Sequence, residues 1–325
     1  MTAMSHQPDG PPAVLAGPGF ATALKRMFLA TRPAFFTASV LPVLVGTAWA
    51  AVALGHFDGW LFALALLATV LAHAATNVYN DVGDDVIGAD AANSGRIYPY
   101  TGGSRFIQTG LVSRADMARL AFGLAVGALA VGALLTWLRG PSVLVLGLIG
   151  LGLGILYSMP GPQLSARGIG EAAVATGLGL LPVIGASWLQ SGQIDAGAVI
   201  VALPVSAWVA AILLINEVPD MESDGRAGKR TLVVRRGVGG ARVIYIGLAA
   251  LAASAGAAAI VLRMLPTWYA VPGAVLAILG IRAAFGMSLQ PADRPRLKKS
   301  IELTLAIHAL GCIALIAAIV SRRFL

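Results

Sequence analysis

Long apolar runs alternate with short polar segments over most of the chain. A helix needs roughly 20 apolar residues to cross the hydrocarbon core of a bilayer. Nine runs approach that length, and we expect each to form a membrane-spanning helix. The expected spans are about 34–54, 61–80, 116–138, 142–159, 169–190, 197–217, 242–263, 267–287 and 301–320. The pattern predicts an all-α, polytopic membrane helix bundle over residues 25–325, preceded by a mobile tail over residues 1–24.

Composition agrees with a membrane protein. Apolar residues make up 58% of the 325 residues and charged residues only 12%, against roughly 25% charged in a soluble domain. The net charge of +8 does not indicate nucleic-acid binding, because the basic residues lie between apolar spans and not on one face. The single cysteine, Cys312, excludes an internal disulfide and a cysteine-rich metal site. Glycine spacings such as Gly150/Gly154 predict close helix packing.

The basic residues are distributed unevenly between the two sides of the predicted bundle. If the N-terminus lies in the cytoplasm, 19 of the 23 lysines and arginines fall on the cytoplasmic side, as the positive-inside rule requires. The two longest connections, residues 81–115 and 218–241, lie on that side too. The sequence therefore predicts a multi-pass protein of the cell inner membrane, with its chemistry concentrated at the cytoplasmic face.

Two polar clusters follow apolar runs with the same spacing. The first comprises Asn77, Asp81 and Asp85, and the second comprises Asn216, Asp220 and Asp224. On a helix, residues four apart stack on one face. Corresponding residues of the two clusters are 139 positions apart. This offset indicates two four-span halves plus a ninth helix, and internal repeats often place a site at their interface.

Carboxylates at membrane depth are costly, so they tend to be functional or paired. Magnesium prefers oxygen ligands and commonly joins one or two carboxylates to substrate phosphates. We therefore expect the four aspartates of the clusters to hold Mg²⁺ (or Mn²⁺) and, through it, a diphosphate. The alternative is that both clusters are solvated helix ends. Pro219 weakens the shared-face argument for the second cluster, because proline disfavours helical geometry in the residue before it and predicts a break near Val218.

Basic residues and glycines near the clusters extend the candidate site. Lys229 and Arg230 follow the second cluster and suit phosphate oxygens, although such charges also contact lipid headgroups. Gly102 and Gly103 precede Arg105 in the first long connection. Glycine-rich backbone can present amides to an anion, or it can form a simple turn.

Four further polar residues lie near span ends. Tyr157 ends the fourth expected span, where a tyrosine is usually an interface anchor. Glu171, near the start of the fifth, either carries chemistry or pairs with Arg167. Arg32, just before the first span, is most simply a topology charge. His73, one turn before Asn77, is of a type that more often hydrogen-bonds to a neighbouring helix than acts as a base.

Both clusters resemble motifs of the UbiA superfamily of membrane prenyltransferases, which carries N-x-x-x-D-x-x-x-D after its second helix and D-x-x-x-D after its sixth. The similarity continues through Arg32-Pro33 and residues 41–46, 101–105, 167–171 and 228–232. The last three segments resemble the menaquinone branch, which uses 1,4-dihydroxy-2-naphthoate. One departure concerns the Tyr-x-x-x-Lys motif of many members, because Gly161 follows Tyr157 at that spacing. Arg167 is our candidate for the missing charge.

The resemblance implies transfer of a polyprenyl group from polyprenyl diphosphate to an aromatic acceptor. Magnesium would bridge the aspartates to the diphosphate, and basic residues would neutralise the leaving group, where negative charge develops. The allylic carbocation would then alkylate the ring, with loss of the ring carboxylate in the menaquinone branch. Arg105 is our candidate for binding that carboxylate. The other expected substrate contacts are Asn77, Asn216, Arg32, Tyr157, Arg167, Glu171 and Arg230, with Lys229 as a catalytic residue.

Three alternatives remain open at this stage. The first is a related transferase with another acceptor, such as 4-hydroxybenzoate, homogentisate, haem, chlorophyllide or a glycerol phosphate lipid. The second is a transporter whose intramembrane aspartates bind ions between repeats. The third is a non-catalytic membrane scaffold, which gives no reason for paired acidic clusters.

Overall fold

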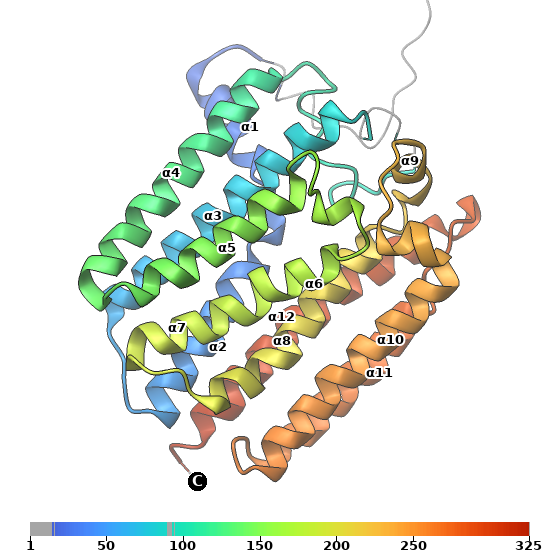
Figure 1. Ribbon diagram of the computed structural model, residues 1–325. Helices are drawn as coiled ribbons and strands as arrows, with labels where there is room; N and C mark the ends of the chain where they lie inside the picture. Colours follow the sequence, from blue (N-terminus) through green and yellow to red (C-terminus); the bar gives the residue numbers. More distant parts are fainter. Residues whose placement is uncertain (1–14, 16, 90–92, 94, 325) are drawn as a thin grey trace, which may run out of the picture.

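A computed structural model of the chain describes residues 15, 17–89, 93 and 95–324. Every regular element among them is helical, as predicted, and the long helices form one elongated bundle (Figure 1). The first helix, α1 (Phe20–Ala30), begins inside the range that the sequence assigned to a mobile tail. Its exposed Phe20, Leu24 and Phe28 recur every fourth residue. At 11 residues α1 is too short to cross a membrane, so the length of apolar runs in the sequence does not reveal it. The rest of the expected tail, residues 1–14 and 16, lies outside the described residues.

The helices follow the predicted order along the chain. The first four spans are α2 (Thr37–Ala53), α3 (Gly59–Val86), α4 (Arg114–Arg139) and α5 (Ser142–Ser158). The fifth joins α6 (Gly170–Val174), a π-helical segment (Ala175–Leu180) and α7 (Leu181–Ser191). The remaining helices are α8 (Ala196–Asn216), the short α9 (Met221–Arg226), α10 (Leu232–Val261), α11 (Ala270–Ala284) and α12 (Arg294–Ser321). Among the described residues, eight segments are long and apolar enough to cross a membrane, and α5, the fourth of the nine expected spans, is shorter at 17 residues.

Side-chain caps fix where several of these helices begin. Asp58 accepts hydrogen bonds from the backbone amides of Trp60 (2.8 Å) and Leu61 (3.1 Å) at the start of α3. Asp195 accepts from the amide of Ala198 at the start of α8 and also from the indole of Trp49, 2.7 Å away on α2. Such caps satisfy amides that have no partner within the helix. The second bond of Asp195 also ties the start of α8 to the end of α2.

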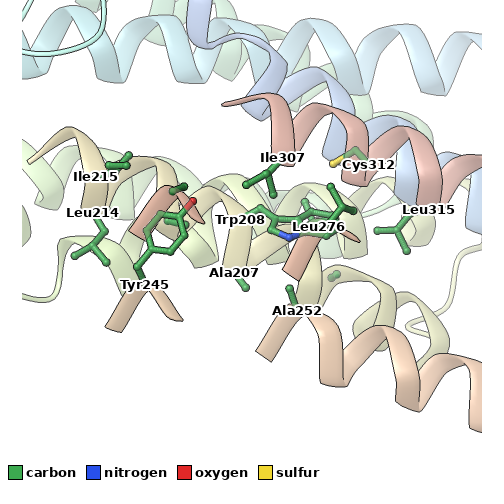
Figure 2. Close-up of a cluster of buried hydrophobic side chains, with 14 of the residues drawn as sticks. Ala207, Trp208, Leu214, Ile215, Tyr245, Ala252, Leu276, Ile307, Cys312 and Leu315 are labelled. Carbon is green, nitrogen blue, oxygen red and sulfur yellow. The ribbon is translucent and has the colours of Figure 1, made fainter. Parts of the chain in front are cut away.

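The largest buried cluster lies in the second half of the bundle. Most side chains of α8 are buried, α10 and α12 pack against it, and α11 packs against α10 and α12. Trp208 of α8, Tyr245 of α10 and Leu276 of α11 belong to one continuous apolar core (Figure 2). The smaller clusters of buried residues lie among the first four spans and α7. The candidate site lies among these first four spans, α7 and α8.

Candidate active site

A cavity of about 400 Å³ runs between the helices of the first half and α8. At one end it is lined by charged and amide side chains from α3, from α8 and from the segments after α8, and we refer to this as the site end of the bundle. Away from that end its walls are apolar, with Leu135 of α4, Val143 of α5 and Trp188 of α7 farthest along. The cavity therefore combines a polar head and a long apolar chamber.

Lys229 joins the two halves at the site end. Its Nζ donates to both carboxylate oxygens of Asp84, at 3.0 and 3.1 Å, and lies 3.7 Å from Oδ1 of Asp224. All three residues are buried and line the cavity. Burial acts to lower the pKa of Lys229, but the charges of Asp84 and Asp224 outweigh it and raise this pKa above its ordinary value. Lys229 is therefore a fixed cation at the head of the cavity.

The last turns of α3 present a different face to the cavity from the one the sequence predicted. Asn77, Asn80 and Asp84 line the cavity, because positions 3 and 7 residues apart share a helix face. Asn77 donates from Nδ2 to the carbonyl oxygen of Thr31 (3.0 Å), and Asn80 donates to the hydroxyl of Ser158 (3.2 Å). Asp84 and Asn80 were not among the predicted site residues.

Asp81 and Asp85 face the first long connection and do not line the cavity. Asp81 is buried; it forms an ion pair with Arg32 and accepts a hydrogen bond from the amide of Ser104 (3.1 Å). Asp85 accepts from Nε of Arg114 (2.5 Å) and Nε2 of Gln108 (3.1 Å). Both carboxylates therefore tie the end of α3 to the segments around it.

Arg32 and Arg105 share an unusual backbone conformation. Their φ angles are 56° and 61°, in the left-handed region that non-glycine residues rarely occupy. Arg105 donates from Nη1 to the carbonyl oxygen of Asn93 (3.2 Å). Such strain persists where surrounding contacts over-determine it, and it concentrates at functional sites. Neither arginine is therefore a simple charge at the edge of a span.

The second cluster breaks its helix as Pro219 predicted. The helix α8 ends at Asn216, and Asp220 is the N-cap residue of the short α9. Asp220 accepts hydrogen bonds from Nδ2 of Asn93 (2.7 Å) and from the amide of Gly102 (3.0 Å). Burial raises the pKa of Asp220, although both hydrogen bonds act in the opposite direction. One connection, the segment after α3, therefore contacts the carboxylates of both clusters.

Gly102 makes that contact possible. Its φ is +70°, and a Cβ atom there would lie 2.8 Å from Cβ of Arg96 and 2.9 Å from Nδ2 of Asn93. Any side chain would displace the amide that Asp220 accepts from. The backbone amide of Gly102 therefore donates to a carboxylate of the protein in this structure, at one of the two glycines expected to present amides to an anion.

Two buried glutamates lie near the site end without conventional partners. Neither carboxylate oxygen of Glu171 has a hydrogen-bond partner within bonding geometry in the described part of the chain, and Oε2 of Glu217 has none either. Burial, and after it the nearby charge of Glu171, raises the pKa of Glu217 well above its ordinary value. Glu217 lines the cavity, as does Tyr157 at the end of α5. Glu217 belongs to neither polar cluster of the sequence and was not predicted as a site residue.

Arg167 and Arg230 do not line the cavity. Arg167 is exposed and donates from Nη2 to the carbonyl oxygen of Gly161 (2.7 Å). Arg230 is also exposed, and neither residue lines the cavity. Tyr157 and Lys229 both line the cavity, so Lys229 is the cation that accompanies Tyr157 at the head of the cavity. The structure therefore does not support Arg167 as a replacement for the missing motif lysine.

Oxygen donors suited to a hard divalent cation gather around the head of the cavity. Asp84, Asp220 and Asp224 line it together with Asn216, whose Oδ1 is buried and has no hydrogen-bond partner. Hard cations such as Mg²⁺ prefer such ligands. Within the described residues no three acidic, histidine or cysteine side chains are close enough to hold a metal alone. The donor chemistry thus fits a cation that shares its ligands between protein carboxylates and a phosphate.

Comparison with known proteins decides the family. Residues 39–318 match the UbiA prenyltransferase family. The chain belongs to this family. It is 34% identical over 254 residues to a 1,4-dihydroxy-2-naphthoate octaprenyltransferase of Mycobacterium tuberculosis, covering 78% of this chain and 82% of that protein. The Escherichia coli protein of the same name is 31% identical, with 65% and 68% covered.

Solved UbiA structures share the fold of this chain. A UbiA homolog from Aeropyrum pernix superposes with a TM-score of 0.64 at 22% identity, covering 88% of this chain and 98% of that one. A UbiA homolog from Archaeoglobus fulgidus bound to DMAPP and Mg²⁺ gives 0.59 at 18% identity, covering 89% and 99%. The transporter and scaffold alternatives are set aside, because the chain is a multi-span membrane protein of a prenyltransferase family.

Proposed function

We propose that this UbiA-family protein transfers a polyprenyl group from polyprenyl diphosphate to 1,4-dihydroxy-2-naphthoate, in menaquinone biosynthesis. The observation that carries the proposal is the cavity, whose head holds Lys229 between two carboxylates and whose body is an apolar chamber. This division matches a substrate with a charged diphosphate and an apolar tail. The relatives from Mycobacterium tuberculosis and Escherichia coli, both named for the naphthoate acceptor, support this choice of ring.

The head of the cavity suits departure of a diphosphate. Lys229 is positioned to neutralise charge that develops on the leaving group, and preorganised charges of this kind stabilise a transition state. Mg²⁺, held by Asp81, Asp85, Asp220 and Asp224 or by Asp84 in their neighbourhood, would supply further neutralisation of the phosphate oxygens. Because Asp81 already binds Arg32, the guanidinium of Arg32 lies beside the same phosphate-binding region.

The apolar walls serve the second half of the reaction. Breaking the allylic C–O bond leaves a carbocation, which water would capture if it were present. The chamber side chains exclude water from that carbon. The ring acceptor then attacks the cation, and its carboxylate leaves as carbon dioxide. For the ring, we propose contacts with Tyr157, Glu171 and Arg105. Of these, Tyr157 lines the cavity, whereas Glu171 and Arg105 lie outside its lining, and Arg105 holds the connection at Asn93.

The site end is proposed to face the cytoplasm, with the protein in the cell inner membrane. The bias of lysine and arginine toward the connections at that end supports this orientation. Labelling of single cysteines from outside intact cells tests it. A cysteine placed in the connection between α5 and α6 should resist a membrane-impermeant thiol reagent, and one placed between α7 and α8 should react.

The function is tested by prenyl transfer with purified protein, Mg²⁺ and a polyprenyl diphosphate. Dihydroxynaphthoate and 4-hydroxybenzoate are offered separately. Product from dihydroxynaphthoate that is lost on chelation, and restored by Mg²⁺ or Mn²⁺, supports the proposal. Product from 4-hydroxybenzoate alone would support the mechanism and would reject dihydroxynaphthoate as the acceptor. Failure to bind any polyprenyl diphosphate contradicts the proposed mechanism itself.

A further inference from the structure

Among the residues of α5 that line the cavity, five form a regular series that alternates with lining leucines such as Leu146 and Leu153. Val143, Gly147, Gly150, Gly154 and Tyr157 all line the cavity. Their spacings of three and four residues place them on one helix face. Three consecutive members of this face are therefore glycines, between an apolar residue at the far end and a tyrosine at the site end.

These glycines differ in what a side chain would meet. A Cβ atom on Gly154 would lie 2.6 Å from Oγ1 of Thr76, so Gly154 permits close packing against α3. A Cβ atom on Gly150 would meet only Cδ1 of Leu181, at 3.9 Å, and one on Gly147 would meet nothing within 4 Å. Gly147 and Gly150 therefore do not serve close helix packing.

Glycine inside a helix is unfavourable by roughly 1 kcal/mol relative to alanine. At Gly147 and Gly150 no backbone strain or packing contact compensates for that cost, because both residues are helical and face open space. What they provide is free volume inside the cavity. The head of the same cavity carries Asp84, Asp220 and Lys229. The volume beside the two glycines is thus continuous with the proposed diphosphate site.

The two glycines lie at different depths. At a rise of about 1.5 Å per residue, Gly150 is about 10 Å and Gly147 about 15 Å along α5 from Tyr157. The lining extends beyond both to Val143 of α5 and Trp188 of α7. A chain whose diphosphate is bound at the head would therefore pass Gly150 first and Gly147 second.

We infer that Gly147 and Gly150 determine the longest prenyl chain that the cavity admits. This inference rests on the proposed function, and it adds the residues that limit the length of the donor. A side chain at either position fills the chamber at its own depth. Each substitution should therefore exclude chains longer than that depth and leave shorter ones unaffected.

The test compares Gly147→Phe and Gly150→Phe with a matched control, Gly152→Phe. Gly152 lies on the same helix outside the cavity lining, and a Cβ atom there would also meet nothing within 4 Å. Binding and transfer are measured with geranyl, farnesyl, geranylgeranyl and octaprenyl diphosphates. A phenylalanine side chain and a long prenyl chain would compete for the same volume, and overfilling of this kind changes an equilibrium by about tenfold or more. We therefore expect the affinity for each excluded donor to fall by about tenfold or more.

The expected result is an ordered cutoff. Gly147→Phe loses binding and transfer of the longest donors, Gly150→Phe loses those of shorter donors as well, and Gly152→Phe retains all of them. Equal losses for every donor would indicate general destabilisation and overturn the inference, as would unchanged selectivity in both variants. If the unsubstituted protein binds the diphosphates but transfers to no ring, the length-dependent Kd still tests the inference while the acceptor is rejected. If it binds none of them, both proposals fail.

Discussion

Lys229 and Asp84 form a buried ion pair across 145 positions of the sequence, with Nζ 3.0 and 3.1 Å from the two carboxylate oxygens. Each side chain is only 10% exposed. The pair joins the last turns of α3 to the segment that follows α9, and so brings the two repeated halves together at the head of the cavity. Removing one partner of a buried pair leaves an uncompensated charge. The site is therefore sensitive to single substitutions at this point.

Asp84→Asn is expected to reduce both activity and stability. It removes one of the two carboxylates that hold Lys229, so kcat should fall by about tenfold or more and the melting temperature should drop by several degrees. Turnover and thermal unfolding in detergent measure the two effects. Asp116→Asn is the control, because Asp116 forms an exposed pair with Arg119 at the start of α4 and such pairs contribute little. Equal behaviour of the two variants would contradict the role of Asp84.

Asp81→Ala and Asp220→Ala are each expected to abolish turnover while the protein still inserts and folds. Both residues are proposed ligands of Mg²⁺, and both accept hydrogen bonds from the connection after α3. A loss of about a hundredfold or more in kcat is the expected size, since several kcal/mol of charge stabilisation is removed. Activity is measured on variants that elute as folded protein on gel filtration. Normal activity in either variant would reject the bridging of the two clusters by metal.

Arg167→Ala should have little effect on prenyl transfer. Arg167 is exposed and its guanidinium donates to Gly161, away from the cavity. The KM for the diphosphate is the informative quantity, and a change of about threefold or less is expected, because an exposed contact contributes well under 1.4 kcal/mol. Lys229→Met, measured in parallel, should raise that KM or lower kcat by far more. The opposite ranking would restore Arg167 as the replacement for the motif lysine.

Glu217→Gln is expected to stabilise the protein in a pH-dependent manner. Burial, followed by the charge of Glu171, raises the pKa of Glu217 in the folded protein above its ordinary value of 4.5. The folded state then binds this proton more tightly than the unfolded state, so its stabilising contribution is lost as pH rises through the folded pKa. Glutamine cannot ionise, so the variant does not lose this stability as the pH rises. The melting temperature of the variant should exceed that of the wild type by a few degrees at neutral and alkaline pH.

The same difference should vanish at pH values below 4.5, where the carboxyl is protonated in both the folded and the unfolded state. Glu222→Gln is the matched control, because Glu222 is exposed and pairs with Arg226 on the short α9. Melting curves over a pH series distinguish the two variants. A pH-independent gain for Glu217→Gln would show that packing, and not ionisation, is responsible.

The pattern of apolar runs in the sequence was sufficient to predict the helix bundle. The apolar runs located the long helices, and Pro219 located the break between α8 and α9. A four-residue spacing could not choose among neighbouring carboxylates, because Asp84 and Asp85 are both near the end of the same helix. Only the placement of Lys229, far away in sequence, shows that Asp84 is the residue that faces the cavity.

Other misses have similar causes. Glu217 belongs to no spacing pattern, and its importance comes from burial beside Glu171, which depends on how α6 packs against α8. Gly150 was assigned to helix packing from its spacing to Gly154, whereas it borders open volume. Sequence shows that a residue is small, but the neighbouring helices decide whether the space it leaves is filled.

The apolar core of α8, α10, α11 and α12 lies apart from the chamber wall of α5. Trp208 and its neighbours anchor the fold in the second half, while Gly147 and Gly150 border free volume in the first. Robustness and substrate preference are thus held by separate parts of one chain. The wall of α5 can accumulate changes without eroding the part that keeps the protein folded. In such an arrangement, descendants of one ancestral enzyme can come to accept donors with prenyl chains of different lengths while they retain the same fold.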